Sequence, residues 1–500
     1  MMCCKQFCEV LKSITGTNYN KNTGADIMSP RVKGNPMRCL RVMATILILL
    51  VTGFGRIFAS DVVPAKLSIA DAIKIALTCN VDIKTAKSNL LTSSSRLRIA
   101  ELQTTYSVGA NTTLEHTPGE SGIANSVFGG VQFRSFSGTE MSLDVSPFGT
   151  GSEPTSLDLT LRHPLTYRRG LLSEKADIIQ TARSQMTIAE RQAFQTQQST
   201  VLSVVRAYFR AVEAREQVKV QERALALIEQ AARDAKRREE AGFARGIDVY
   251  RAEVQVQQTR ERLNVRRESA KAALDQLMLA IGVGVGATPE LIDAIPEVKP
   301  ELPSLEDAIS KALKNRSELV VYDERLTTQA RQVSIAEEAL KTRIDAVMRF
   351  RSSSPENLIS ASMLEEGSSA IGLEIRVPID RRAIREERDI ATRELNILRE
   401  ERAFREEQIA EEVRSAYRSL ESAATSLEIL AQNLEVAKKN LLIAERMVEE
   451  GEADNRDVLS AQESLASAES GMLSAKVDLY LASLELNYAI GEDLTKVSLQ

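Results

Sequence analysis

Two long stretches of the chain repeat small and aliphatic residues at the spacing of a coiled coil. Residues 168–240 and 381–450 hold no proline, and Gly170 is their only glycine. Because an α-helix rises 1.5 Å per residue, each stretch would form a rod of roughly 100 Å. We therefore predict two very long helices that pack closely through alanine. In the second stretch, the two core positions of the heptad hold Val413, Leu420, Leu427, Leu434, Leu441 and Val448, and Ala416, Ala423, Leu430, Ala437 and Ala444.

Other segments alternate apolar and polar residues with the period of two that is typical of strands. They are residues 141–146, 157–162, 344–351 and 371–377, and we predict four strands from them. A soluble sheet with one wet face explains the pattern. A membrane sheet, with its apolar face toward lipid and its charged face toward a watery lumen, explains it as well. Four strands cannot close a barrel and an open edge cannot persist in lipid, so a membrane sheet would require several chains to pool their strands.

A motif near the start of the chain recurs in its second half. Ser68 begins the sequence SIADAI, and Ser304 begins SLEDAI at an offset of 236 positions. A serine at this place can accept a hydrogen bond from the exposed amides of a first helical turn. We therefore predict one helix over about residues 69–104 and another over about 305–342.

Two glycine motifs repeat at a different offset. Gly242 and Gly451 each begin a Gly-x5-Asp-Val turn, and Gly282 and Gly491 each end an Ala-Ile-Gly sequence, all 209 positions apart. One structural unit has therefore been duplicated, and the first copy holds a longer insert between its landmarks.

The repeats and the composition together divide the chain. We expect a signal peptide and leader over 1–59, a first structural repeat over 60–287, a Pro-rich linker over 288–303, a second repeat over 304–491 and a tail over 492–500. Each repeat would contain a helix, strands and a long helical hairpin.

The leader resembles an export signal. Two arginines precede the apolar run 42–54, which is too short to span a bilayer comfortably, and Ala59 is a small residue suited to cleavage before Ser60. We favour a cleaved signal over an uncleaved anchor, and Met37 is a second candidate start. Four of the five cysteines lie in the leader, so Cys79 alone would remain and no internal disulfide could form.

Charge is distributed unevenly along the chain. The net charge is −5, but residues 1–59 carry eight Lys or Arg against two acidic residues, or +6, which leaves −11 for the remainder. This balance argues against nucleic acid as a partner. Trp is absent and aromatic residues make up 4% of the chain, a composition typical of long helices packed through small side chains.

No constellation of residues indicates catalysis or a metal. The two histidines, His116 and His163, lie in strand-rich segments without a nearby cysteine or a helical partner four residues away. The glycines from Gly282 to Gly286 follow a helix and lack the Lys-Ser/Thr pair of a phosphate loop, so we interpret them as a helix end. We expect no enzyme activity, no cofactor and no metal.

Taken in order, these motifs resemble the TolC-like outer-membrane factor family, the exit ducts of bacterial efflux and type I secretion systems. The resemblance covers residues 67–491 and rests on the Leu67 opening LSIADA, the glycine turns and the Ala-Ile-Gly endings. It implies a mainly α fold with a β-barrel portion. Each chain of a homotrimer would give four strands to a twelve-stranded outer-membrane barrel and its helices to a periplasmic α-barrel.

The resemblance also assigns a site. The turns of the long helical hairpins would form a periplasmic tip, and an adaptor protein would dock there on Gly242, Phe243, Ala244, Gly451, Glu452 and Ala453. Asp457 matches an acidic position at the tunnel constriction, Asp248 is its counterpart in the first half, and Ser460 occupies a second acidic position of the family. Asp457 also suits the start of a helix as a cap. Val448 stands where the family has a tyrosine that latches the closed state.

The implied function is a passive trimeric conduit in outer-membrane lipid. An inner-membrane pump of the RND or ABC type would deliver substrates to it through a periplasmic adaptor, also called a membrane fusion protein. The alternative is a periplasmic adaptor or structural coiled-coil protein. Adaptors usually have one helical hairpin with a lipoyl-like and a small β-barrel domain, whereas this chain has two hairpins and amphipathic strands. The cargo, whether drugs, metals or protein, is left open, because the pump selects it.

Overall fold

The computed structural model describes residues 64–497 except for 103, 118–119, 150–154, 243–244, 285, 298–303, 355–366 and 451. The chain divides into two units, Met1–Ala59 and Ser60–Gln500. The second unit is the one described below. The predicted signal peptide, part of the predicted linker and three predicted tip residues, Phe243, Ala244 and Gly451, lie outside the described residues.

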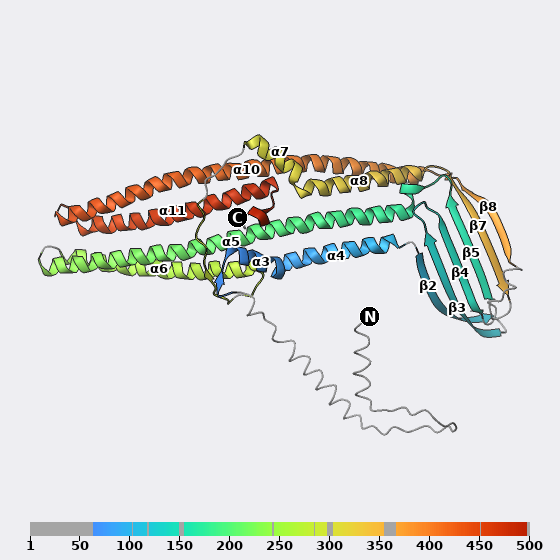
Figure 1. The fold of residues 1–500 in the computed structure, drawn as a ribbon, viewed down its shortest axis with the longest axis horizontal. Helices are drawn as coiled ribbons and strands as arrows, with labels where there is room; N and C mark the ends of the chain where they lie inside the picture. Colours follow the sequence, from blue (N-terminus) through green and yellow to red (C-terminus); the bar gives the residue numbers. More distant parts are fainter. Residues whose placement is uncertain are drawn as a thin grey trace, which may run out of the picture. The chain divides into compact units, whose positions relative to one another are not determined.

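Each half contains a pair of short helices, then strands, then a long helical hairpin, and the first half has two more strands than the second (Figure 1). The first half contains β1 (Lys66–Leu67), α3 (Ile69–Cys79), α4 (Val81–Glu101), β2 (Thr104–Thr117), β3 (Glu120–Arg134), β4 (Glu140–Gly149), β5 (Thr155–Pro164), η1 (Gly170–Leu172), α5 (Glu174–Glu240) and α6 (Gly246–Ile281). The second half contains β6 (Glu290–Leu291), α7 (Leu305–Asn315), α8 (Ser317–Glu338), β7 (Arg343–Ser354), β8 (Ser368–Arg376), α10 (Arg382–Glu449), α11 (Asn455–Ile490) and α12 (Leu494–Val497).

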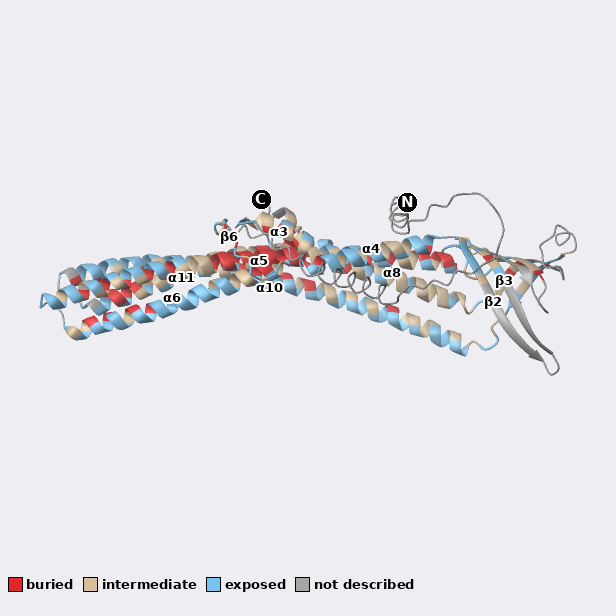
Figure 2. Ribbon diagram, turned by 90° about the horizontal axis from the view of Figure 1, so that it is seen from below, coloured by how far each residue is buried: buried red, intermediate tan, exposed pale blue. Residues whose placement is uncertain are grey.

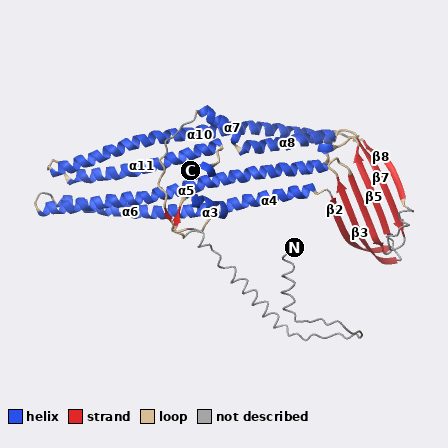
Figure 3. Ribbon diagram, viewed as in Figure 1, coloured by secondary structure: helices blue, strands red, loops and turns tan. Residues whose placement is uncertain are grey.

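The two very long helices predicted from the heptads are confirmed. Helices α5 and α10 contain 67 and 68 residues. Along its length, α5 packs first against α4 and then against α6, and α10 packs first against α8 and then against α11. Figure 3 shows the sheet at one end of these helices and the turns of the two hairpins at the other.

The single opening helix predicted for each half is wrong, because each is broken in two. The break falls at Asn80 in the first half and at Arg316 in the second, again 236 positions apart, and both residues have extended backbone. Asn80 caps α4 by accepting hydrogen bonds from the amides of Asp82 (2.8 Å) and Ile83 (3.4 Å). The predicted caps Ser68 and Ser304 are confirmed: each accepts from an amide three residues later, at 3.1 and 3.2 Å.

A glycine packs against each break. Gly282 and Gly491 end α6 and α11 in the left-handed conformation, with φ of 85° and 82°. A Cβ on Gly282 would come within 2.6 Å of the Cα of Asn80, and one on Gly491 within 3.2 Å of the carbonyl carbon of Asn315. The two Ala-Ile-Gly motifs of the sequence therefore let the end of each returning helix approach the backbone of the broken helix.

The main buried core lies at the level of these breaks (Figure 2). In the first half, Tyr208, Phe209 and Leu277 are at most 1% exposed and belong to one apolar cluster that joins α3, α5, α6 and α11. A second cluster joins α7, α10 and α11 around Ile409 and Val413. Alanines at the seam positions keep the helices close enough for this packing.

The sheet differs from the prediction in its number of strands. The described residues form one antiparallel sheet of six strands in the order β2-β3-β4-β5-β7-β8, not four. The four predicted strands correspond to β4, β5, β7 and β8, and the hairpin of β2 and β3 was missed. Its residues include Thr, Ser, Asn and Gly at high density, which weakens the apolar alternation that identifies a strand.

No helix among the described residues has both the length and the apolar character needed to cross a membrane.

Candidate functional sites: the sheet faces and the hairpin tips

One face of the sheet is apolar across neighbouring strands. The register aligns Leu143, Leu159 and Phe350 in one row across β4, β5 and β7. A second row runs through Met141, Leu161, Met348 and Ile371 and reaches β8. Since side chains alternate between the two faces of a strand, all of these residues lie on the same face.

Much of this apolar face is exposed. Ile371 is 83% exposed, Leu373 65% and Ile375 59%. Isolated exposed apolar residues are common on protein surfaces, but a contiguous patch marks a surface that contacts a partner or a membrane. The register of β7 with β8 also places Ile344, Met348, Leu373 and Ile375 on this face.

The opposite face carries charged side chains in cross-strand pairs. Arg162 of β5 lies 3.0 Å from Glu374 of β8, and Arg351 of β7 lies 2.6 Å from Asp158 of β5. Asp345, which is fully buried, pairs with Arg343 at 2.6 Å. One sheet therefore has an apolar face and a charged face, as the alternation in the sequence predicted.

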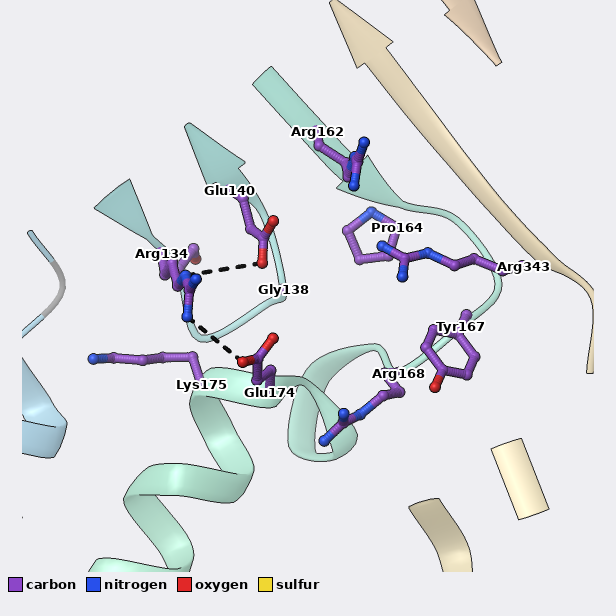
Figure 4. Close-up of a pocket in the computed structure, with 11 residues that line it drawn as sticks. Arg134, Gly138, Glu140, Arg162, Pro164, Tyr167, Arg168, Glu174, Lys175 and Arg343 are labelled. Carbon is purple, nitrogen blue, oxygen red and sulfur yellow. Dashed lines mark ion pairs between the residues drawn. The ribbon is translucent and has the colours of Figure 1, made fainter. Parts of the chain in front are cut away.

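A basic pocket of about 140 Å³ lies where the charged face meets the start of α5 (Figure 4). Arg134 is placed 3.9 Å from Glu140 and 3.6 Å from Glu174. The Nζ of Lys175 donates to the carbonyl oxygen of Leu102. Burial and the neighbouring charge of Arg134 lower the pKa of Lys175. Five cationic side chains line the pocket: Arg134, Arg162, Arg168, Lys175 and Arg343.

The turn of the first hairpin depends on a glycine. Gly242 has a φ of 80°, and its amide donates to the carbonyl oxygen of Glu239 at 2.9 Å. A Cβ at this position would meet no atom within 4 Å, so the backbone conformation alone favours glycine. Nearby, Asp248 lies in the first turn of α6 and pairs with Arg251 at 3.4 Å.

The turn of the second hairpin is held by backbone hydrogen bonds. The amides of Glu452 and Ala453 donate to the carbonyl oxygen of Met447 at 2.8 and 3.1 Å. The side chain of Glu452 is exposed, whereas Ala453 packs against the apolar cluster that contains Val448. The second turn therefore presents the exposed side chain of Glu452 over a small apolar core.

Asp457 is an exposed helix cap. Its carboxylate accepts a hydrogen bond from the amide of Asp454 at 3.2 Å, at the start of α11. Ser460, one turn further along, is also exposed. Within the described part of the chain Asp457 makes no ion pair, so its charge is not locally neutralised.

The sequence matches one family over most of its length. The model of the outer membrane efflux protein family matches residues 133–283 and 308–492.

The chain belongs to the outer membrane efflux protein family.

Solved structures of outer-membrane channels share the fold of this efflux protein. The channel OprN is 18% identical, with a TM-score of 0.64 over 85% of this chain and 90% of its own. CmeC of Campylobacter jejuni is 16% identical, with a TM-score of 0.66 over 86% and 88%. VceC of Vibrio cholerae is 16% identical, with a TM-score of 0.65 over 85% and 96%. A search of curated proteins found no match.

Membership in this family indicates where the protein lies and what it does. The protein is an outer-membrane efflux channel whose helices extend into the periplasm, and its relatives are channels rather than enzymes. The alternative of an adaptor or a coiled-coil rod is not supported. Among the described residues, no three His, Cys, Asp or Glu side chains are arranged to hold a metal.

Sequence reasoning missed two features of the efflux channel, the basic pocket and the hairpin of β2 and β3. The pocket gathers Arg134, Arg162, Lys175 and Arg343 from distant parts of the chain, and no local motif connects them. The hairpin did leave a signal, because the offset between the two halves falls from 236 before the strands to 209 after them.

Proposed function

We propose that this efflux channel works as a homotrimeric, passive duct across the outer membrane. The observation that carries the proposal is the exposed apolar face of a sheet whose outer strands, β2 and β8, each have one neighbour in the described structure. Such edges do not persist in lipid unless another strand pairs with them. Copies of the same chain supply those strands when the sheets join edge to edge.

The test is the assembly state of the mature protein. After purification from membranes, the protein should need detergent to stay in solution. Its measured molecular mass should be that of a trimer. In planar bilayers it should conduct ions without any energy source. A soluble monomer would contradict the proposal.

We assign the docking of a periplasmic adaptor to the turns of the two hairpins. The exposure of Gly242 and Glu452 supports this assignment, because both residues lie at the turns above packed apolar clusters and are accessible to a partner. The same two turns of the sequence also contain Phe243, Ala244 and Gly451. Ala453 packs against the apolar cluster beneath the second turn. An inner-membrane pump of the RND or ABC type would supply the energy through this adaptor.

Site-specific cross-linking tests the docking assignment. A photoreactive residue at Glu452 should capture an adaptor in cells, whereas the same residue at Ile371, on the apolar face of the sheet, should not. Equal capture from both positions would count against docking at the tips.

We assign the constriction of the duct to Asp457, with Asp248 and Ser460 beside it. Three copies of Asp457 around one axis would concentrate negative charge that no ion pair neutralises. Asp248 contributes less to this field because Arg251 compensates it. Such a ring favours cations in a narrow opening.

We also propose that residues 1–59 are a signal peptide removed during export. Sequencing of the N-terminus of the protein from membranes should begin at Ser60. A chain that retains the apolar run 42–54 would instead be anchored by it.

A further inference from the structure

The hairpin of β2 and β3 is additional to the duplicated unit. Its two strands contain 14 and 15 residues. The offsets between the two halves, 236 before the strands and 209 after them, differ by 27 residues, which is close to the length of this hairpin. Among the described residues, the second half has two strands, β7 and β8, at the corresponding place. The surplus residues of the first half therefore account for two extra strands.

Both ends of the hairpin are held at the same place. Before β2, the carbonyl oxygen of Leu102 accepts from Lys175. After β3, the carbonyl oxygen of Phe136 accepts from the hydroxyl of Ser173 at 2.8 Å. Ser173 and Lys175 are two residues apart at the start of α5. The chain thus leaves the start of α5 and returns to it, and β4 could follow α4 directly without the hairpin.

The hairpin continues both the sheet and its apolar face. Strands β2 and β3 pair without interruption from Thr104 with Phe133 to Thr117 with Glu120. Through β3, the register aligns Tyr106 with Val131, and Val131 with Leu143 of β4. Tyr106 is 78% exposed and lies in the apolar row of the other strands. Exposed apolar side chains on one face of a fully paired strand are typical of a β-barrel wall that faces lipid.

The strand lengths fit a membrane as well. A tilted strand needs roughly 9–11 residues to cross the hydrocarbon layer. The six strands contain between 9 and 15 residues, with β8 the shortest and β3 the longest. The additional hairpin is therefore as able to span the membrane as the four strands that the repeat predicts.

From these observations we infer that each copy contributes six strands to the membrane wall, so that the trimer forms a barrel of eighteen strands. The inference rests on the proposed trimer. Strand β2 of one copy pairs with β8 of the next. Six is an even number, so β2 and β8 of one copy run in opposite directions, and the contact between copies is antiparallel like the contacts within each copy. Because barrel diameter grows roughly linearly with strand number, the pore through the membrane is about 1.5 times as wide as that of a twelve-stranded barrel.

Cysteine cross-linking between copies distinguishes the two barrels. In a Cys79→Ser background, Thr105→Cys or Ser107→Cys on β2 is combined with Ala370→Cys or Gly372→Cys on β8. A parallel set combines Ser142→Cys on β4 with the same two positions on β8. In an eighteen-stranded barrel, oxidation converts the β2–β8 variants into covalent trimers, and the β4–β8 variants remain monomers in denaturing gels.

The other outcomes separate this inference from the proposed function. Covalent trimers from β4–β8 pairs would keep the trimeric duct but overturn the six-strand wall. A detergent-requiring trimer without any β2–β8 cross-link would also overturn it. A soluble monomer would overturn both proposals.

Deletion of residues 104–134 gives an independent readout. The shortened protein should still form a trimer in detergent, because α4 and β4 meet at the start of α5. The size of the largest polyethylene glycol that enters the pore from the extracellular side should fall by about one third, from the width of eighteen strands to that of twelve. An unchanged size limit in a trimeric deletion variant would contradict the inference.

Discussion

The hydroxyl of Tyr208 donates a hydrogen bond to the carboxylate of Asp293 at 2.8 Å. The same carboxylate oxygen accepts from the amide of Ile69 at 2.6 Å, and the Tyr208 hydroxyl also lies 3.0 Å from the carbonyl oxygen of Leu67. Strands β1 and β6 pair in parallel beside this network, at Leu67 and Leu291. One tyrosine on α5 thus joins the start of the first half to the segment that leads into the second.

Tyr208→Phe should destabilise the protein by about 1–3 kcal/mol, because it leaves the partly buried carboxylate of Asp293 without one of its donors. Tyr417, its counterpart 209 positions later, is only half-buried, so Tyr417→Phe is the matched control. Chemical denaturation in detergent measures both changes. Equal effects of the two substitutions would show that the Asp293 network adds nothing.

The same tyrosine should make stability fall at high pH. Burial, and then the hydrogen bond to Asp293, raise the pKa of Tyr208 above its ordinary value of 10.0. Above pH 10 the unfolded chain loses this proton more readily than the folded chain, so the stabilisation is complete below pH 10 and is lost as pH rises beyond it. The melting temperature of Tyr208→Phe should therefore decline less steeply above pH 10 than that of the wild type. Parallel declines would refute the assignment.

Leu373→Arg should cost about 2–4 kcal/mol if the apolar face of the sheet meets lipid near the middle of the bilayer. Gly372→Arg is a matched control one residue away on the opposite face, where a Cβ meets no atom within 4 Å. Replacement of Arg349 on that face should also leave assembly intact. The yield of trimer from membranes measures the effect. Similar losses from Leu373→Arg and Gly372→Arg would argue against a membrane-facing surface.

Gly282→Ala should be more harmful than Gly242→Ala. Both glycines have positive φ, which costs an alanine about 1–2 kcal/mol. Only Gly282 packs against backbone, because its Cβ would come within 2.6 Å of the Cα of Asn80. The difference between the two variants in thermal unfolding therefore reports the close approach at the helix break. If the two variants unfold at the same temperature, the break tolerates a side chain.

Asp457→Ala should lessen the cation preference of the channel and weaken its block by multivalent cations. It should also cost roughly 0.5–2 kcal/mol, because the cap on the Asp454 amide is lost. Ser460→Ala, one turn away, should change neither property. Reversal potentials in planar bilayers decide between the two roles of Asp457. Unchanged selectivity with reduced stability would leave only the cap.

Much of this fold is encoded in local sequence patterns. Heptads of Val, Leu and Ala specify α5 and α10 wherever the rest of the chain lies, and Ser68 and Ser304 mark helix starts through their own hydroxyls. The breaks are a different case. Asn80 is a common helix cap, but Arg316 carries no local signal, and the residue that packs against this break, Gly491, lies more than 170 positions later.

In the candidate site, too, some features could be predicted from local sequence and others could not. The cap formed by Asp457 could be predicted, because it involves residues three positions apart. The pairing of Arg162 with Glu374 depends on β5 and β8 lying on either side of β7, which no local pattern specifies. The strand pair of β2 and β3 could have been inferred only from comparison of the two halves, since its polar residues conceal the alternation.

Ser173 and Lys175 donate hydrogen bonds to the two ends of the hairpin, and this arrangement has an evolutionary consequence. A segment that departs from and returns to one helical turn can be gained or lost in a single genetic event without moving its neighbours. The width of the pore and the length of the helices can then change independently in evolution. A lineage could widen its outer-membrane exit for bulkier cargo while it keeps the same pump and the same adaptor.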